Sequence, residues 1–189
     1  DAIERLKIQT GTSYCYPTSS MGAHVSVSPN EQLQRQTPLK TRADVAYFGA
    51  FGYELDLNAL STEELAQIKR QIAFMKEHRQ LFQFGTFYRL QTPFESNIVS
   101  WLVVSPDKKH AIMGYFKILN DVNAEYRLQR VPSLNPSTEY KVKEEAGDSL
   151  GSFSGSELAK IGLVTTDASA GENKETTDFY SKLFIFDAE

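Results

Sequence analysis

Carboxylates are the side chains of this sequence best suited to acid–base chemistry, which needs two such groups held a few ångströms apart around a reacting bond. Glu54 and Asp56 stand two residues apart in an extended run, so they would project to one face of a strand. The other candidates in the N-terminal half are Asp1, Glu4 and Asp44. Glu4 and Asp44 lie in amphipathic helical patterns and are expected to face solvent. Spacing alone therefore assigns no catalytic pair.

The three histidines, His24, His78 and His110, are too far apart in the sequence to suggest a metal site. His24 interrupts a run of small and apolar residues. It could contact a ligand hydroxyl or orient a carboxylate, but the residues alone favour a hydrogen-bonded core histidine. The sequence has no glycine-rich phosphate loop and no nucleophile elbow. We therefore expect neither a metal nor a cofactor.

Composition excludes several classes of protein. The 189 residues are 41% hydrophobic and carry a net charge of −4, with no clustered Lys and Arg of the kind that binds nucleic acid. No apolar run is long enough to span a membrane, and no signal peptide is visible, so no membrane partner and a cytoplasmic location are expected. The single cysteine, Cys15, follows Tyr14 and is predicted to be buried and inert.

The N-terminal half alternates helical and strand patterns, as parallel α/β structure does. The patterns predict a helix over 1–13 and a mostly buried strand over 21–27. A second helix is predicted to begin with Thr37 as N-cap and Pro38 as its first residue and to end at Gly49. A buried strand over 51–57 follows, and then a helix from the capping box Ser61–Glu64 to about His78. Asp1 itself fits the start of the first helix, where its charge favours the helix dipole.

From about residue 84 the pattern changes to short strands, which indicates an antiparallel sandwich. Strands are predicted over 86–90, 98–104, 111–119, 126–131, 139–143 and 179–186. Residues 155–164 fit either a short helix or a turn leading to a strand, and 167–177 form a polar loop. Aromatic residues are frequent here, and we expect them in the core rather than stacked on a glycan: Tyr88, Trp101, Tyr115, Phe116 and Tyr126.

Several blocks, in this order, closely resemble retaining α-galactosidases of glycoside hydrolase family 36. They are DAIERLKIQ-x-GTS at 1–13, MGAHVS at 21–26, TPLKTR-x-DVA at 37–46, FGYELDL at 51–57 and FYRL-x-x-PFE at 87–95, with VVSPDK at 103–108. The resemblance is close over about the first 120 residues and weaker beyond them.

The resemblance implies a fold of the α/β plus all-β class. Residues 1–84 would be the last part of a (β/α)₈ TIM barrel, and residues 85–189 an antiparallel β-sandwich domain. The implied reaction removes terminal α-linked galactose from melibiose- or raffinose-type oligosaccharides with retention, using an Asp nucleophile and an Asp acid/base. The final Asp of the family's Ser-Asp-Asp-Thr-Asp-type run matches Asp1, so both catalytic carboxylates would lie outside this chain. The fragment alone would then be inactive.

Within such a barrel, this chain would supply part of the wall around the substrate. The resemblance makes His24, Ser26, Asp1 and the loop Pro29–Pro38 the candidates to lie near the galactoside. It also implies a homo-oligomer, in this family commonly a tetramer. The alternative hypothesis is a non-catalytic carbohydrate-binding or oligomerisation module built on the β-sandwich.

Overall fold

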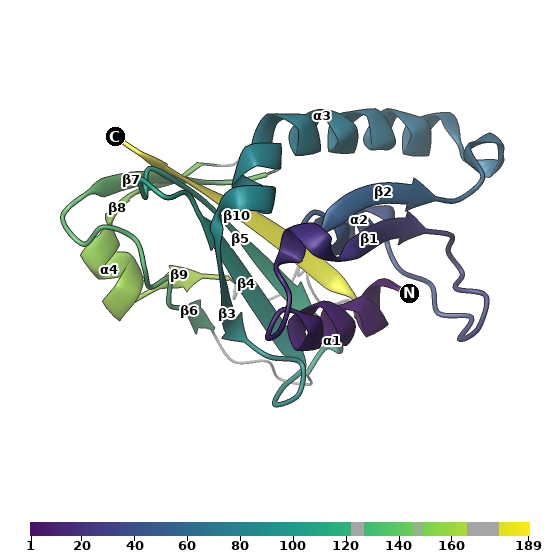
Figure 1. The fold of residues 1–189 in the computed structure, drawn as a ribbon, viewed down its shortest axis with the longest axis horizontal. Helices are drawn as coiled ribbons and strands as arrows, with labels where there is room; N and C mark the ends of the chain where they lie inside the picture. Colours follow the sequence, from purple (N-terminus) through teal and green to yellow (C-terminus); the bar gives the residue numbers. More distant parts are fainter. Residues whose placement is uncertain (122–126, 146, 148, 166–177) are drawn as a thin grey trace, which may run out of the picture. The chain divides into compact units, whose positions relative to one another are not determined.

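The computed structural model describes residues 1–121, 127–145, 147, 149–165 and 178–189 (Figure 1). The chain divides into two compact units, Asp1–Phe84 and Gly85–Glu189, each with a sheet of its own. Among the described residues, no helix combines the length and the apolar character needed to cross a bilayer.

The first unit is built of helices and two short parallel strands. Its elements are α1 (Ala2–Thr12), the 3₁₀ turn η1 (Thr18–Ser20), β1 (Gly22–Ser26), α2 (Leu39–Ala46), β2 (Ala50–Glu54), the 3₁₀ turn η2 (Leu57–Ala59) and α3 (Thr62–Phe84). Strand β1 pairs with β2 in parallel from Gly22↔Ala50 to Ser26↔Glu54. Because parallel neighbours need a crossover, α2 connects the two strands as the helix of a β–α–β unit.

Local rules explain the start of the first unit. The Asp1 side chain accepts from the amides of Ile3 and Glu4 and so caps α1, and Ile3 and Leu6 bury its apolar face. Gly49 precedes β2 and lies against β1, where a Cβ would come within 2.7 Å of the Ala23 Cβ. Only glycine allows this close approach between the two segments.

Three helix and strand predictions in the first unit need correction. Pro38, not Thr37, is the N-cap of α2, and it makes no side-chain capping bond. Thr37 instead donates its amide to the Ser28 hydroxyl at 3.1 Å. Strand β2 is half-exposed rather than buried, because within the described chain β1 alone pairs with it. Helix α3 runs six residues beyond the predicted His78, to Phe84.

The capping box at the start of α3 is confirmed. The Ser61 hydroxyl accepts from the Glu64 amide at 3.2 Å, and the Glu64 carboxylate accepts from the Ser61 amide at 2.9 Å. The extra C-terminal turns of α3 have a reason in packing. Phe82 is buried and contacts the rings of Tyr47 and Phe48, with centroids 5.7 and 5.1 Å apart.

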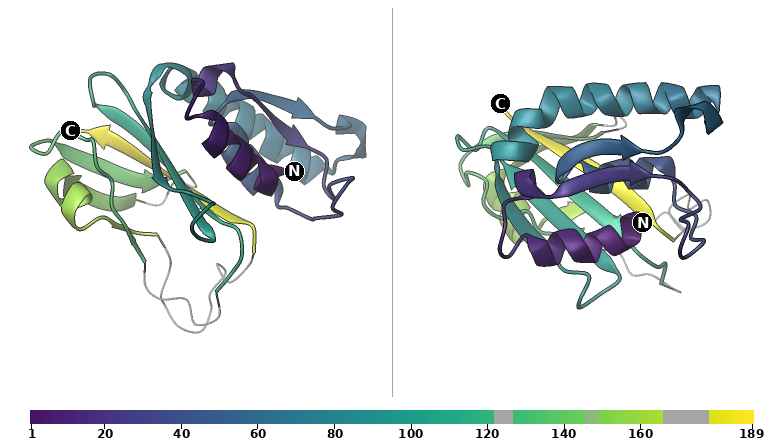
Figure 2. Two further views of the ribbon diagram at one scale, coloured as in Figure 1. Left: turned by 60° about the horizontal axis from the view of Figure 1, so that its bottom comes forward. Right: turned by 45° about the vertical axis from the view of Figure 1, so that its right-hand side comes forward.

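The second unit is dominated by a six-stranded antiparallel sheet (Figure 2). Its strand order is β3-β4-β5-β10-β7-β8, and a second small sheet pairs β6 with β9. The elements are β3 (Thr86–Gln91), β4 (Ile98–Val104), β5 (His110–Lys117), β6 (Leu128–Gln129), β7 (Glu139–Glu144), β8 (Ser149–Ser154), α4 (Gly155–Lys160), β9 (Leu163–Val164) and β10 (Tyr180–Ala188).

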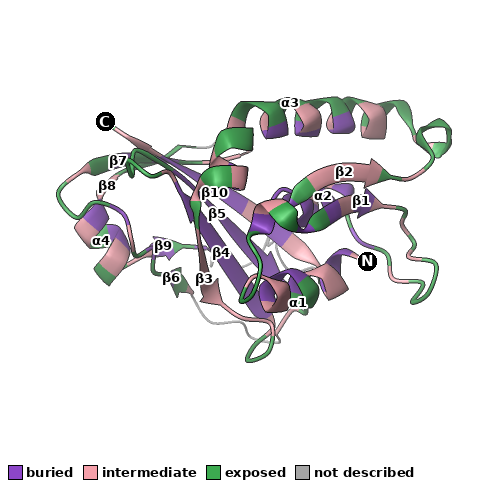
Figure 3. Cartoon of the chain, viewed as in Figure 1, coloured by how far each residue is buried: buried purple, intermediate pink, exposed green. Residues whose placement is uncertain are grey.

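The core of the second unit lies between one face of the large sheet and a thin layer that contains β9 and α4. Val131, Leu134, Leu158 and Leu163 from that layer pack against side chains of β4, β5, β7 and β10. Every residue of β4 is buried, and all of β5 except His110 (Figure 3). Tyr115 belongs to this core and Tyr88 packs against it. Trp101 and Phe116 are buried as well, as expected, whereas Tyr126 lies outside the described residues.

Sequence patterns identified most strands of this unit but missed β8. Strand β8, Ser-Leu-Gly-Ser-Phe-Ser, lacks both the β-branched content and the alternation that mark a strand, and it forms an edge of the sheet. Strand β9 has only two residues. The ambiguous stretch 155–164 contains both alternatives, the short helix α4 and then β9. The polar stretch 167–177 lies outside the described residues.

Candidate functional site on the parallel strand pair

Alternation along β1 separates a packed face from a polar face. Ala23 and Val25 are fully buried, while His24 and Ser26 are on the opposite face and only half-buried. In the β1–β2 register, His24 is opposite Gly52 and Ser26 is opposite Glu54. The structure therefore brings His24 and Ser26 to one surface with the carboxylate of Glu54.

His24 is part of a charged cluster rather than the core. Its Nδ1 atom lies 3.3 Å from a Glu54 carboxylate oxygen and 3.4 Å from the Arg5 guanidinium. The His24 side chain is 42% exposed and that of Glu54 is 73% exposed. The expectation of a packed core histidine is thus wrong, because the facing position is Gly52 and leaves the ring uncovered. A Cβ at Gly52 would lie only 3.4 Å from His24 Cδ2.

Arg5 and Arg42 hold the two ends of β1. Arg5 donates to the Gly22 carbonyl at 2.8 Å, and Arg42 donates to the Ser26 carbonyl at 2.6 Å. Burial lowers the pKa of both guanidinium groups, and Glu54 opposes this shift at Arg5. Both groups stay protonated at neutral pH because their ordinary pKa is so high. The strand that carries His24 and Ser26 is therefore fixed in place by two cations.

Asp1 makes a different set of contacts. One carboxylate oxygen accepts from the Ile3 and Glu4 amides and, at 2.8 Å, from the Arg35 guanidinium. The Asp1 side chain is only 6% exposed. Arg35 also lies 3.5 Å from a Glu4 carboxylate oxygen. Asp1 therefore contacts the loop between β1 and α2 through Arg35, whereas His24 contacts Arg5 and Glu54.

The other carboxylates are occupied structurally. Asp44 is buried and paired with Lys40 one turn earlier on α2, so the expectation that it faces solvent is wrong. Asp56 caps η2 by accepting from the Asn58 amide at 2.9 Å. Strand β2 ends at Glu54, so Glu54 and Asp56 do not share a strand face as predicted.

The remaining reactive side chains form no centre. Cys15 is exposed, contrary to the prediction of burial, because it follows α1 in a surface turn. His78 packs against the Phe74 ring, and His110 bonds to Asp187 at 2.8 Å on the other unit. Across the residues that the structure describes, no group of three or more His, Cys, Asp or Glu side chains could hold a metal ion.

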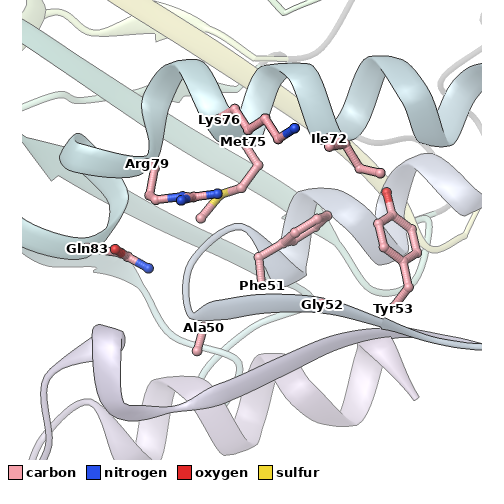
Figure 4. Close-up of a pocket in the computed structure, with 9 residues that line it drawn as sticks. All are labelled: Ala50, Phe51, Gly52, Tyr53, Ile72, Met75, Lys76, Arg79 and Gln83. Atoms are coloured by element: carbon pink, nitrogen blue, oxygen red, sulfur yellow. The ribbon is translucent and has the colours of Figure 1, made fainter.

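A pocket of about 390 Å³ lies between β2 and α3 (Figure 4). Phe51 and Tyr53 point from β2 toward Ile72 and Met75 of α3. The lining also includes Ala50, Gly52, Lys76, Arg79 and Gln83. The Tyr53 hydroxyl donates to the Gln71 side chain at 2.8 Å, and burial raises its pKa. Apolar and polar side chains thus both line this hollow between β2 and α3. No strand of the described chain pairs with the second edge of β2.

Comparison with known proteins gives these features a context. Residues 1–85 match the family model described as melibiase, and residues 98–186 match the glycosyl hydrolase family 36 C-terminal domain. The chain belongs to the family 36 α-galactosidases. Among its relatives, α-galactosidase AgaA of Geobacillus stearothermophilus is 47% identical over 87% of the chain and 22% of its own length. Mel36A of Lactobacillus acidophilus is 40% identical over 100% of the chain and 24% of its own length.

Solved structures agree with this family assignment. A family 36 AgaA variant in complex with raffinose superposes with a TM-score of 0.91 at 43% identity, covering 100% of this chain and 25% of AgaA. A second AgaA variant, solved with stachyose, gives the same values. The predicted fold class, the last part of a TIM barrel followed by an antiparallel β-sandwich, is confirmed. The chain spans about a quarter of the length of the relatives it matches.

Sequence reasoning missed the arginines of this site. Arg5 and Arg35 were not distinguished from the other basic residues, which are scattered through the chain. The only sequence signal is that both fall within or beside the blocks that resemble family 36. Their partners, Gly22, His24 and Asp1, are 17 to 34 residues away, beyond the reach of any local pattern.

Proposed function

We propose that this chain is the C-terminal part of an α-galactosidase that hydrolyses terminal α-linked galactose from melibiose- or raffinose-type oligosaccharides with retention. The observation that supports this most directly is the match of the whole chain to a quarter of AgaA, which has been solved with raffinose and with stachyose. Residues 1–84 would form the end of the catalytic barrel, and residues 85–189 the β-sandwich domain.

The two-stranded parallel sheet supports the barrel assignment. Parallel strands occur almost only in larger sheets that are covered on both faces. Among the described residues, β2 pairs with β1 alone, along one of its two edges. In the proposed enzyme, a further barrel strand would pair with the other edge of β2.

The catalytic carboxylates would come from outside this chain. Retaining glycosidases use two carboxyl groups about 5–5.5 Å apart, one as nucleophile and one as acid/base. In this unit Asp1, Asp44, Glu54 and Asp56 each have a structural or ionic partner of their own. None of them is arranged as half of such a pair.

The polar face of β1 would then line the active site. Barrel active sites form at the carboxyl ends of the strands, which here are Ser26 and Glu54. We propose that His24 and Ser26 contact the galactoside or the groups that bind it, with Glu54 and Arg5 setting the orientation of the imidazole. Asp1 would lie near the substrate but act through its contacts, since its side chain is almost entirely buried.

The test is a chimera. Replacing the matching segment of AgaA with this chain should give a soluble enzyme that releases galactose from raffinose and from a nitrophenyl α-galactoside. The isolated 189-residue chain should release none. A folded chimera without activity, or hydrolysis by the isolated chain, would refute the proposal. The intact mass of the protein isolated from its source would show whether further barrel sequence accompanies this chain.

The alternative of a carbohydrate-binding module finds less support. Stacking on a sugar needs exposed aromatic rings, yet Trp101, Tyr115 and Phe116 of the second unit are buried. Retention of the unit on a galactoside column after removal of residues 1–83 would favour this alternative.

A cytoplasmic homotetramer is our proposal for the state of the whole enzyme. It is supported by the family resemblance alone. Light scattering on the purified active chimera should give four times the subunit mass.

A further inference from the structure

The loop between β1 and α2 is attached to the start of α1 by a partly buried ion pair. Arg35 Nη1 lies 2.8 Å from Asp1 Oδ1 and 3.5 Å from Glu4 Oε1. The Arg35 side chain is 24% exposed, against 6% for Asp1. Exposed ion pairs are worth little, but removing one member of a desolvated pair leaves the other charge uncompensated. Breaking the contact between Arg35 and Asp1 is therefore expected to cost more free energy than breaking an exposed ion pair.

The loop itself is internally ordered. The Asn30 amide donates to the Arg35 carbonyl at 2.9 Å, and the Gln34 amide donates to the Asn30 carbonyl at 2.8 Å. The Asn30 side chain accepts from the amides of Gln32 and Leu33. Its base is closed by the bond from the Thr37 amide to the Ser28 hydroxyl. Residues 28–37 thus form one preformed turn, which Arg35 connects to α1.

The tip of this loop presents polar side chains to solvent. Residues 31–34, Glu-Gln-Leu-Gln, are all exposed, and they follow the carboxyl end of β1. Amide and carboxylate groups are suited to hydrogen-bonding several hydroxyls at once. A rigid loop tip with this chemistry matches a polyhydroxylated ligand, provided that the whole loop is held in place.

We propose that Arg35 is a positioning residue for oligosaccharide binding: by pairing with Asp1 and Glu4 it holds the loop 28–37 where its tip contacts the α-galactoside. Because this role presumes the α-galactosidase activity proposed above, a change at Arg35 should affect substrate binding rather than the chemical step. The loop would otherwise sample orientations in which its polar tip misses the sugar.

The experiment uses the AgaA chimera that carries this chain. Arg35→Met should raise KM for raffinose by roughly tenfold or more while kcat changes by less than about threefold, since small misplacements of positioning groups are costly. Arg35→Lys keeps the charge but loses the planar fork, so it should restore part of the lost affinity. Glu4→Gln removes the longer contact and should raise KM less than Arg35→Met does.

Hydrogen exchange gives a second readout that does not depend on turnover. In Arg35→Met the amides of Leu33 and Gln34 should exchange faster, and that of Val25 in β1 should not. The matched control is Arg127→Met in the second unit, which removes an exposed pair with Asp121 at 2.7 Å and should leave KM unchanged.

The outcomes separate this inference from the proposed function. An inactive but folded wild-type chimera refutes the function itself. If the wild-type chimera is active, an unchanged KM in Arg35→Met overturns the positioning role. A fall in kcat with a shifted pH profile and an unchanged KM overturns it as well, since Arg35 would then act on the acid/base chemistry.

Discussion

The two units of this chain use strands in opposite ways. In the second unit, β4, β5, β10 and β7 each have two neighbours, and one face of their sheet packs on a core formed within the unit. In the first unit, β1 and β2 pair only with each other among the residues that the structure describes, and β2 has no fully buried residue. Each of those four strands of the second unit therefore forms backbone bonds with twice as many neighbours as β1 or β2 does. A parallel strand pair depends on further strands, whereas an antiparallel sheet with its own covering layer does not.

Hydrogen exchange should reveal the largest difference between the units. Amides of the central strands β5 and β10 should open only with global unfolding, while those of β2 should open locally at far lower free energy. We expect at least about a thousandfold slower exchange in β5, measured on the 189-residue chain by mass spectrometry. Equal protection of β2 and β5 would show that the first unit is as self-sufficient as the second.

Core truncations should sharpen this contrast. Phe184 is fully buried in the second-unit core, so Phe184→Ala should cost about 3–5 kcal/mol of unfolding free energy. Phe51 of β2 is half-exposed, so Phe51→Ala should cost far less. The single tryptophan, Trp101, is buried in β4, so its fluorescence in urea reports the second unit. Phe51→Ala should leave the urea midpoint of the Trp101 transition unchanged. A large shift of that midpoint would contradict the idea that the two units unfold separately.

Both units contain a capping box, which allows a matched comparison. Ser61 caps α3 in the first unit, and Ser154 caps α4 in the second. There the Glu157 amide donates to the Ser154 hydroxyl at 3.2 Å, and the Glu157 carboxylate accepts from the Ser154 amide at 2.8 Å. Replacing an N-cap serine by alanine costs about 1 kcal/mol. Ser154→Ala should therefore lower the midpoint of the Trp101 transition, and Ser61→Ala should lower helix content by circular dichroism without moving that midpoint.

The smallest expected effects concern pH. Hydrogen bonds from Ser61 lower the pKa of Glu64, and hydrogen bonds from Ser154 lower that of Glu157, both below the ordinary 4.5. A carboxyl whose pKa is lower in the folded state stabilises the fold above its unfolded pKa, and this contribution is lost as pH falls through the folded pKa. Glu157→Gln should flatten the fall in stability of the second unit below about pH 4.5. Glu64→Gln should leave that profile unchanged.

Much of the fold could be predicted because its signals are local. The start of α1 at Asp1, the capping box at Ser61 and the bounds of β4 follow from capping chemistry and from β-branched or aromatic runs. Strand β8 and the last turns of α3 could not be predicted in this way. An edge strand of serines is set by its partner β7, and the end of α3 is set by the packing of Phe82.

The candidate site depended more on tertiary structure. The family resemblance named His24 and Ser26 as candidates to lie near the substrate, and the alternation in β1 places both on one face. The sequence left open that His24 orients a carboxylate but did not identify Arg5 or Glu54 as its partners. It also did not indicate that Asp44 would be buried beside Lys40 or that Cys15 would be exposed. These outcomes depend on which side chain of another element comes within a few ångströms, and local periodicity carries no such information.

The amino-acid sequence by itself determined the order of helices and strands, the change from parallel to antiparallel architecture near residue 84, and membership of the family 36 α-galactosidases. Only the tertiary structure decided which charges meet, such as Arg35 with Asp1 across 34 residues. The physical reason is the distance along the sequence over which each interaction acts. Capping and alternation act within one or two turns or along one strand. An ion pair such as Arg35–Asp1 forms only after the chain has brought distant segments together.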